Sequence, residues 1–361
     1  MRHLSIRVNP AKMSEFYGNC DDESFDNIDI TTTMFGTKFN SVLWNASGVM
    51  CTEYQELQTI LDSPYTGAVV TKSCTLKPRA GNPEPRYADS KSTKTRGNWS
   101  INSMGIPNNG IDYYIQGVTS SMTPKLKRND KPYFISISGL SVIENLEMID
   151  RIRTAKSLID AKCAVELNLS CPNIVGKAQL CYDFEGMEDT LRKLFDGSHE
   201  LRIPIGLKMS PYFDISHFNS AVDVLEPFSN RLSFLTCSNS IGNGMLIDAD
   251  TESTLIYPKH GLGGCGGDPM RPVALSNVYT FNNLLGEKLD IIGCGGVNNG
   301  DDVFNLILAG AKGVQVGTFL ARKGVESFKY LTDDLKRRMK KNGYENIEEF
   351  RGKVKRINPK L

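Results

Sequence analysis

Residues 167–173, which read LNLSCPN, bring a thiol, a hydroxyl and amides together in one short segment. The run AVELNLS predicts a strand that ends here, so several polar side chains gather at its carboxyl end: Asn168, Ser170, Cys171 and Asn173. Cys171 could serve as a nucleophile or as a base. Nucleophilic cysteines normally need a histidine partner, and none of the four histidines lies at a predicted strand end. We therefore predict a base role, in which nearby amides and lysine charge favour the thiolate.

Two lysines, Lys72 in VVTKS and Lys208 in IGLKMS, follow apolar runs on two different predicted strands. A single lysine of this kind could lie on the surface with its stem along apolar neighbours. Two of them at the ends of separate strands indicate a functional pair that faces a shared site. Their charge could stabilise an anionic ring, such as a reduced flavin, or hold a substrate carboxylate. A lysine that forms a Schiff base with a carbonyl substrate is the competing use.

Glycines end the last two predicted strands, as Gly295-Gly296 and as Gly317-Thr318. In α/β barrels this position commonly binds phosphate, because backbone N–H groups and a helix N-terminus face the anion. Glycine also lets the backbone approach the phosphate oxygens closely. Two tight turns are the plainer explanation, but the paired position favours phosphate.

Two further segments have the composition of loops. GLGGCG, residues 261–266, matches the dinucleotide fingerprint G-x-G-x-x-G, yet it follows YPKH rather than a strand, and prolines come after it. We therefore predict a flexible glycine-rich loop beside the same phosphate and no Rossmann unit. INSMGIPNNG, residues 101–110, offers Asn102 and a run of backbone N–H groups, and taken by itself it predicts only a turn.

Eight β-branched runs are expected to position these residues. The predicted strands cover 42–47, 67–73, 133–138, 164–170, 205–210, 232–238, 291–295 and 313–318. A helix-like segment follows each of them, for example at 144–159, 301–310 and 328–341. This alternation predicts a (β/α)8 TIM barrel, an α/β fold whose active sites lie at the carboxyl ends of the strands. Long insertions at 74–110 and 239–270 are expected to build or cover the site on that face.

Composition argues against several function classes. The 361 residues carry a formal net charge of +1, which favours neither nucleic acid nor an anionic membrane as a partner. The nine cysteines include no CxxC pair, which indicates a reduced, cytoplasmic protein without disulfides or a metal site. No apolar run reaches the ~20 residues that span a bilayer, and the first residues lack the apolar core of a secretory signal. We expect a polar extension at 1–32 and a single barrel domain at 33–361.

Taken together, the motifs resemble the dihydroorotate dehydrogenase family, and most closely its soluble class 1A branch. The resemblance rests on NASG (45–48), TKS (71–73), GNPEPRY (81–87), INSMGIPN (101–108), LNLSCPN (167–173), NSIGNG (239–244), IGCGG (292–296) and VGT (316–318), in the family's order. It implies an FMN-containing barrel, normally a cytosolic homodimer, that oxidises dihydroorotate to orotate in pyrimidine biosynthesis and passes the electrons to fumarate. The membrane-bound class uses a serine base, whereas this chain carries Cys171. The NAD-linked class works with a separate iron–sulfur subunit and does not carry NSIGNG followed by a glycine-rich segment.

By motif match, the resemblance assigns Cys171 as the base that takes the proton from C5 of dihydroorotate, with Lys72 as a second catalytic residue. The pyrimidine and its carboxylate would be bound by Lys72, Asn102, Met104, Gly105, Ile106, Asn168, Asn173, Asn239 and Ser240. The FMN ring and ribityl chain would be lined by Ala46, Ser47, Gly48, Lys72, Ser73, Ser136, Asn168, Ser238 and Cys294. Lys208 would face the N1/O2 edge and stabilise the reduced anion, and Gly267, Gly295, Gly296, Gly317 and Thr318 would bind the phosphate. Amides suit a planar ring with alternating donors and acceptors, because each amide carries both.

The chain departs from the family after the cysteine, where NIVGKAQ (173–179) replaces the usual NVPGKPQ. Val175 and Ala178 stand in place of prolines, so we expect a less stiff lid. Ser210 also replaces a proline. Two other functions stay open on the residues alone. One is a Schiff-base sugar-phosphate lyase that uses Lys72 or Lys208, and the other is a flavin-binding barrel that turns over no substrate.

Overall fold

The structure, a computed structural model, describes residues 27–93, 96–117, 130–155, 162–170, 179–195 and 203–357. Eight parallel strands form one sheet in the order β3-β16-β15-β10-β9-β8-β7-β4. Their bounds are β3 (Leu43–Asn45), β4 (Val69–Val70), β7 (Tyr133–Ile137), β8 (Cys163–Asn168), β9 (Ile205–Lys208), β10 (Phe234–Cys237), β15 (Asp290–Cys294) and β16 (Gly313–Val316). Each strand overlaps one predicted run, so the predicted TIM barrel is confirmed.

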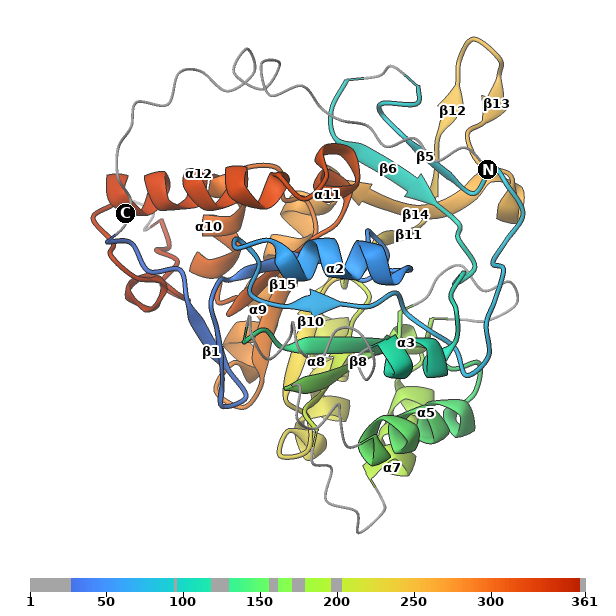
Figure 1. Cartoon of the computed structure of the whole chain (residues 1–361), viewed down its shortest axis with the longest axis horizontal. Coiled ribbons are helices and arrows are strands. Elements are labelled where there is room, and N and C mark those ends of the chain that lie inside the picture. Colours follow the sequence, from blue (N-terminus) through green and yellow to red (C-terminus); the bar gives the residue numbers. More distant parts are fainter. Residues whose placement is uncertain are drawn as a thin grey trace.

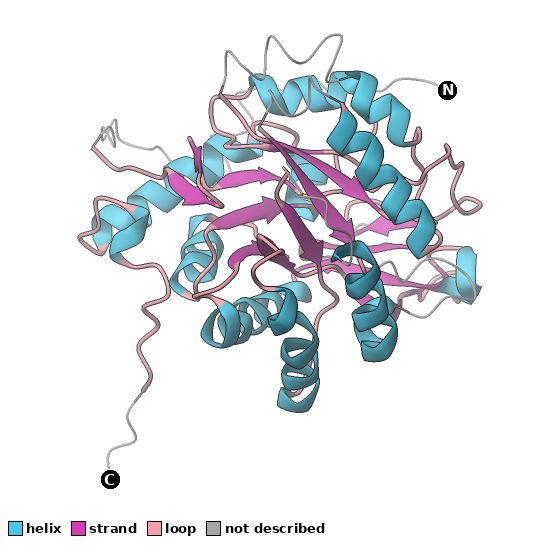
Figure 2. Cartoon of the chain, turned by 90° about the horizontal axis from the view of Figure 1, so that it is seen from below, coloured by secondary structure: helices cyan, strands magenta, loops and turns pink. Residues whose placement is uncertain are grey.

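A helix follows each barrel strand, and Figure 2 shows the helices around the outside of the strands. They are α2 (Tyr54–Asp62), α3 (Ile111–Gly117), α5 (Val142–Thr154), α7 (Phe184–Phe195), α8 (Ile215–Leu225), α9 (Met270–Leu285), α10 (Gly300–Leu308), α11 (Thr318–Lys323) and α12 (Ser327–Lys341). Short 3-10 turns occupy Leu180–Tyr182, Glu226–Phe228, Pro258–Gly261 and Ile347–Glu349. The predicted helices at 301–310 and 328–341 correspond to α10 and α12. The one at 144–159 corresponds to α5, and residues 156–161 lie outside the described part.

The barrel strands present two environments, because successive side chains of a strand point to opposite faces. The odd-numbered residues of β8 belong to the large core shared with the helices. On its inward face, Ala164 joins an apolar cluster with Phe134 and Phe234. Glu166 comes next and accepts a hydrogen bond from another barrel strand, and Asn168 lines a cavity. The inward face thus changes from apolar to charged to amide toward the carboxyl end.

A hairpin of β1 (Thr32–Met34) and β2 (Thr37–Phe39) packs against the amino end of the barrel strands (Figure 1). Phe39 stacks on Trp44 at 5.5 Å between ring centroids. The Phe35 N–H donates to Asp290, the first residue of β15, over 2.6 Å. Ile28 is also buried, so the packed body already includes residues ahead of the domain start predicted at 33.

The two insertions pair with each other in an antiparallel sheet, here called the roof sheet, which lies at the upper right of Figure 1. Its order is β11 (Ile241–Met245), β14 (Leu262–Gly267), β6 (Trp99–Asn102) and β5 (Tyr87–Asp89). A small hairpin of β12 (Ile247–Asp248) and β13 (Ser253–Thr254) extends from it.

The prediction of a flexible loop at 261–266 is therefore wrong, because this segment forms strand β14, which pairs with β6 and β11. Its glycines serve close packing. A Cβ on Gly263 would lie 2.5 Å from the Asn102 carbonyl oxygen, and one on Gly264 would lie 2.2 Å from Ser240 Oγ. Since the pairing partners come from a distant part of the chain, local composition could not predict the strand.

The barrel closes between β3 and β4 with the help of a side chain. The Gly67 N–H donates to the Leu43 carbonyl over 2.8 Å. Beyond that bond, the Asn45 amide takes the place of a neighbouring backbone. Its Oδ1 accepts from the Val70 N–H at 3.0 Å and its Nδ2 donates to the Val70 carbonyl at 2.8 Å. Asn45 is fully buried, so it is a structural clamp and does not line the cavity.

Replacement of this clamp, Asn45→Ala, is expected to lower the free energy of unfolding by about 3 kcal/mol, because two buried backbone groups of Val70 lose their partner. Urea denaturation monitored by circular dichroism would measure the change. Asn305→Ala, at an exposed position of α10, is the control and should change stability by less than about 0.5 kcal/mol. Equal effects of the two substitutions would contradict the clamp.

Candidate active site

A cavity lies between the carboxyl ends of the barrel strands and the roof sheet. Its wall contains most of the residues that the sequence singled out: Ala46, Ser47, Gly48, Lys72, Ser73, Asn102, Met104, Ile106, Asn168, Lys208, Ser238, Asn239, Ser240, Gly267, Cys294, Gly295, Gly296, Gly317 and Thr318. They come from barrel strand ends and from both insertions. Closure of the barrel therefore brings together residues that are far apart in the chain.

Among the described residues, two predicted site residues, Ser136 and Gly105, are not in that wall. Ser136 is fully buried behind Ser73 and shares a 2.9 Å hydrogen bond between the two hydroxyls, so it supports the wall from behind. Gly105 is buried between two lining residues. Cys171 and Asn173 lie outside the described residues, as do Val175 and Ala178.

The start of the LNLSCPN segment is held by a network of amides and hydroxyls. Asn168 Oδ1 accepts from the Ser170 N–H at 3.1 Å and from Ser170 Oγ at 3.0 Å, while Asn168 Nδ2 donates to Ser73 Oγ at 3.2 Å. Asn239 Nδ2 donates to Ser170 Oγ at 2.8 Å. These bonds fix the orientation of both amides and hold the backbone directly before Cys171.

Ser210, where the family usually has proline, adds a contact that proline could not make. Its backbone N–H donates to Cys181 Sγ at 3.2 Å, and its hydroxyl donates to Gln179 Oε1 at 2.6 Å. Gln179 is the last residue of the NIVGKAQ segment. The substitution therefore ties the described end of that segment to the strand end after β9.

Lys72 presents its ammonium to the cavity. Its backbone N–H donates to the Cys51 carbonyl at 2.8 Å, which fixes the strand end. The ammonium lies 3.8 Å from the point where a Cβ on Gly48 would stand. No carboxylate or hydrogen-bond acceptor within the described residues pairs with it. The cation is thus available to an anionic ligand.

Lys208 is held by neighbours inside the barrel. Its Nζ donates to Gln315 Oε1 at 2.8 Å and to Cys294 Sγ at 3.2 Å. Gln315 Nε2 donates in turn to Glu166 Oε2 at 2.7 Å. Burial favours the neutral amine, but the Cys294 sulfur and the Glu166 carboxylate outweigh it and raise the pKa of Lys208. Lys208 is therefore a fixed, buried cation at the cavity wall.

The glycine corner comprises Gly267, Gly295, Gly296, Gly317 and Thr318. Gly295 has φ 131° and Gly296 φ 76°, conformations that favour glycine. A Cβ on Gly296 would lie 2.3 Å from the Arg271 Cα, so the turn packs tightly on α9. A Cβ on Gly317 would meet only the Ala46 Cβ, at 3.7 Å, so its near side opens into the cavity.

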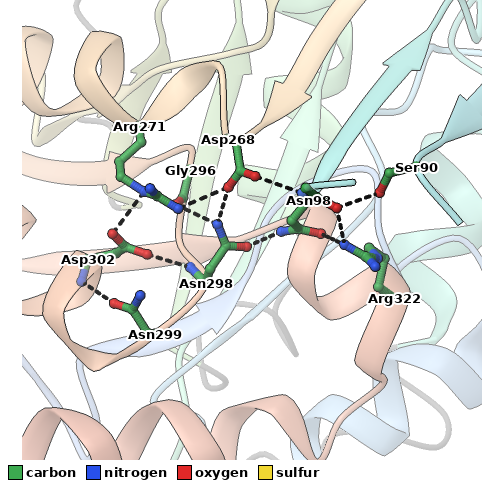
Figure 3. Close-up of polar contacts among 10 residues, drawn as sticks. Ser90, Asn98, Asp268, Arg271, Gly296, Asn298, Asn299, Asp302 and Arg322 are labelled. Carbon is green, nitrogen blue, oxygen red and sulfur yellow. Dashed lines mark hydrogen bonds and ion pairs between the residues drawn. The ribbon is translucent and has the colours of Figure 1, made fainter. Parts of the chain in front are cut away.

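A polar chain ties the glycine corner to the roof sheet and to α11 (Figure 3). Asp268 accepts from the Asn98 N–H at 2.7 Å, from Asn298 Nδ2 at 2.6 Å and from Arg271 at 2.9 Å. The amides of Asn98 and Asn298 also bond to each other. Arg322 of α11 donates to Asn98 Oδ1 at 2.7 Å. One carboxylate thus joins three segments that meet at the corner.

The same chain continues to the backbone of the corner. Arg271 Nε donates to the Gly296 carbonyl at 3.3 Å and lies 2.9 Å from Asp302 Oδ1. Asp302 also accepts from the Asn298 N–H at 2.9 Å. Burial raises the pKa of Asp302, although these partners favour its charged form. The contacts fix the position of the turn.

Sequence reasoning missed several wall residues: Val49, Tyr87, Ser100, Met270, Val297, Gln315 and Ala321. Gln315 had a local signal, since it is a polar residue in the middle of the apolar run GVQVG. Glu166 in AVELN had the same signal. Tyr87 and Ser100 reach the site only through the roof sheet, which no local pattern predicts. Gly266, the last residue of the glycine-rich segment 261–266, also lines the wall.

In the described part of the chain, no helix is both long enough and apolar enough to cross a bilayer.

Comparisons with known proteins agree with the geometry. A sequence profile of the family described as "Dihydroorotate dehydrogenase" matches residues 29–339. A Trypanosoma cruzi protein named dihydroorotate dehydrogenase (fumarate) is 46% identical over 319 residues, which cover 88% of this chain and 96% of that protein. A Lachancea kluyveri protein of the same name is 43% identical over 316 residues, which cover 88% and 95%. A solved structure of ligand-free DHODH from Eimeria tenella has a TM-score of 0.71 at 20% identity, covers 95% of this chain and 96% of that chain, and supports the fold alone. The chain belongs to the dihydroorotate dehydrogenase family.

Proposed function

We propose that this protein oxidises (S)-dihydroorotate to orotate in pyrimidine biosynthesis, with FMN as cofactor and fumarate as the final electron acceptor. The observation that carries the proposal is the gathering of amides, two lysines and a glycine corner around one cavity. It is supported by relatives named dihydroorotate dehydrogenase (fumarate) at 43–46% identity.

The cavity suits FMN on two grounds. Ser238 Oγ is buried and has no partner within the described residues, which leaves a hydroxyl for a ligand. The space beside Gly317, which no described protein atom fills, could hold the FMN phosphate. The ring and ribityl chain would be held by Ala46, Ser47, Gly48, Lys72, Ser73, Asn168, Ser238 and Cys294, and the phosphate by Gly267, Gly295, Gly296, Gly317 and Thr318. When bound, FMN supplies an acceptor for the two electrons that leave the substrate.

The amides would orient the substrate ring. Asn102, Asn168 and Asn239 line the cavity together with Ser240, and we assign Asn173 to the same set from the sequence. Amides can match both the N–H and the C=O groups of a dihydropyrimidine, and a site of this kind rejects analogues that leave its polar groups unpaired. The backbone of Met104, Gly105 and Ile106 would complete the carboxylate side.

Cys171 would hold the proton that leaves C5 of the substrate. It directly follows Ser170, which Asn168 and Asn239 fix by hydrogen bonds. A thiolate near an ammonium is a competent base at neutral pH. We assign that ammonium to Lys72, which lines the cavity and would also pair with the substrate carboxylate.

The alternative of a Schiff-base lyase finds no support at Lys208. An amine nucleophile needs a lowered pKa, whereas the surroundings of Lys208 raise its pKa.

The class 1A resemblance carries two further proposals, that the protein is a homodimer and that it works in the cytoplasm. Light scattering of the purified protein would test the first, since a homodimer has twice the chain mass of 40.0 kDa. A monomer at micromolar concentration would contradict it.

The protein is expected to purify with a yellow flavin that dihydroorotate bleaches in the absence of oxygen. Fumarate should restore the colour, and NAD should not. Stopped-flow absorbance measures both half-reactions. Fast reoxidation by NAD alone would overturn the choice of acceptor, and a colourless protein that takes up no FMN would overturn the proposal.

Cys171→Ser is expected to slow flavin reduction by dihydroorotate at least about 100-fold near neutral pH, because a hydroxyl is a far weaker base than a thiolate. FMN should stay bound, and the rate should recover partly as the pH rises. Cys265→Ser, in the roof sheet outside the cavity wall, is the matched control and should keep the original rate. An unchanged rate in Cys171→Ser would place the base elsewhere.

Gly317→Ala is expected to weaken FMN binding at least about tenfold, because the added methyl group enters the space proposed for the phosphate. Riboflavin, which lacks the phosphate, should bind both proteins with similar affinity. Fluorescence titration measures both ligands. An equal loss for FMN and riboflavin would mean that the corner does not bind phosphate.

A further inference from the structure

Glu166 is a buried carboxylate that the proposed reaction does not use. It lies on the inward face of β8, between Ala164 of the apolar cluster and Asn168 of the cavity wall, and it has no exposed surface. A lone ionised carboxylate in such surroundings is strongly disfavoured, so a buried one is normally paired or protonated.

The hydrogen bonds around Glu166 indicate which form is present. Lys208 can only donate, so its bond to Gln315 Oε1 turns the Gln315 Nε2 toward Glu166 Oε2. The Thr236 hydroxyl donates to the same oxygen at 2.8 Å. Glu166 Oε1 has no partner within the described residues. Oε2 therefore accepts two hydrogen bonds, and the buried ammonium on the other side of Gln315 supplies the counter-charge that a buried carboxylate needs.

The charge that balances this carboxylate is the ammonium of Lys208, which is only 4% exposed. The groups that act on Lys208 are the thiols of Cys294 and Cys237 and the carboxylate of Glu166. Glu166 is the carboxylate among them, and Gln315 links it to the ammonium. The barrel interior therefore holds a cation and an anion joined by one amide.

We propose that Glu166 is a positioning residue that acts through Gln315 to keep Lys208 charged and oriented, and that it moderates the positive field of Lys208 in the cavity. The inference rests on the proposed function, because FMN is the group that would feel this field. Lys208 lines the cavity, whereas Glu166 does not reach it. Glu166 thus sets the net charge beneath the cofactor without contacting it.

The first test measures the pairing in the protein as purified, without added FMN. Glu166→Gln keeps the shape and removes the charge, and it should raise the unfolding equilibrium constant at least about tenfold, because a buried ammonium loses its counter-charge. In a Lys208→Met background the same substitution should lower that constant or leave it unchanged, because it then removes a buried carboxylate that has no counter-charge. Equal effects in both backgrounds would overturn the pairing.

The second test measures the midpoint potential of the FMN-loaded protein at pH 6, where Lys208 keeps its proton. Glu166→Gln should favour flavin reduction about tenfold, a potential about 30 mV more positive for a two-electron couple. The reason is that Lys208 then acts on the ring without an opposing charge. Thr236→Val removes a hydrogen bond to Glu166 but keeps the carboxylate, so it is the control and should leave the potential unchanged.

The outcomes separate this inference from the proposed function. If FMN binds and Glu166→Gln leaves the potential unchanged or makes it more negative, the inference fails while the function stands. If Thr236→Val shifts the potential as far as Glu166→Gln does, the effect is structural and the inference also fails. If the protein binds no FMN, the proposed function fails, and the unfolding measurements alone decide whether Glu166 pairs with Lys208.

Discussion

Closure of the barrel between β3 and β4 is the constraint on which the site depends. These two strands are the shortest contributors to the sheet, with three and two residues, and they meet through the Gly67 bond and the Asn45 amide. The chain continues from both strands directly into the cavity wall, at Ala46 and at Lys72. The Asn45 side chain, which replaces backbone pairing here, therefore determines the relative position of the wall segments that begin at Ala46 and Lys72.

Inside the closed barrel, polarity rises toward the carboxyl ends in layers. Phe134 and Phe234 fill the lower layer, Glu166 and Lys208 occupy the next, and amides face the cavity. Electrostatic interactions are stronger where water is excluded, and unpaired polar groups cost more there. The opposite charges of Glu166 and Lys208 can therefore act together on the electrostatic field that a ligand in the cavity would experience.

The sequence pattern was sufficient to predict the barrel and most residues of the cavity wall. Each strand is a β-branched run, and polar or glycine residues follow at its carboxyl end. Lys72, Lys208 and the glycine corner were found in this way. The strand character of β14 could not be predicted, since its partner β6 lies in the other insertion. Ser136 was expected to line the cavity, but it lies behind Ser73, because its orientation depends on the neighbouring strand. Gln315 and Glu166 were visible as polar residues in apolar runs, but only the closed barrel joins them to Lys208.

The roof sheet has a consequence for how the protein is made. β6 is translated well before β14, and four barrel strands lie between them in the chain. Until the ribosome has delivered β14, the nascent polypeptide carries β6 with one edge unpaired, and such edges attract other chains. Asn102 thus reaches its final surroundings late in translation, although the barrel strands on either side of β6 can begin to pair earlier. If translation stopped before β14 emerged, the released chain would contain most of the barrel strands, but β6 would keep an unpaired edge that favours aggregation.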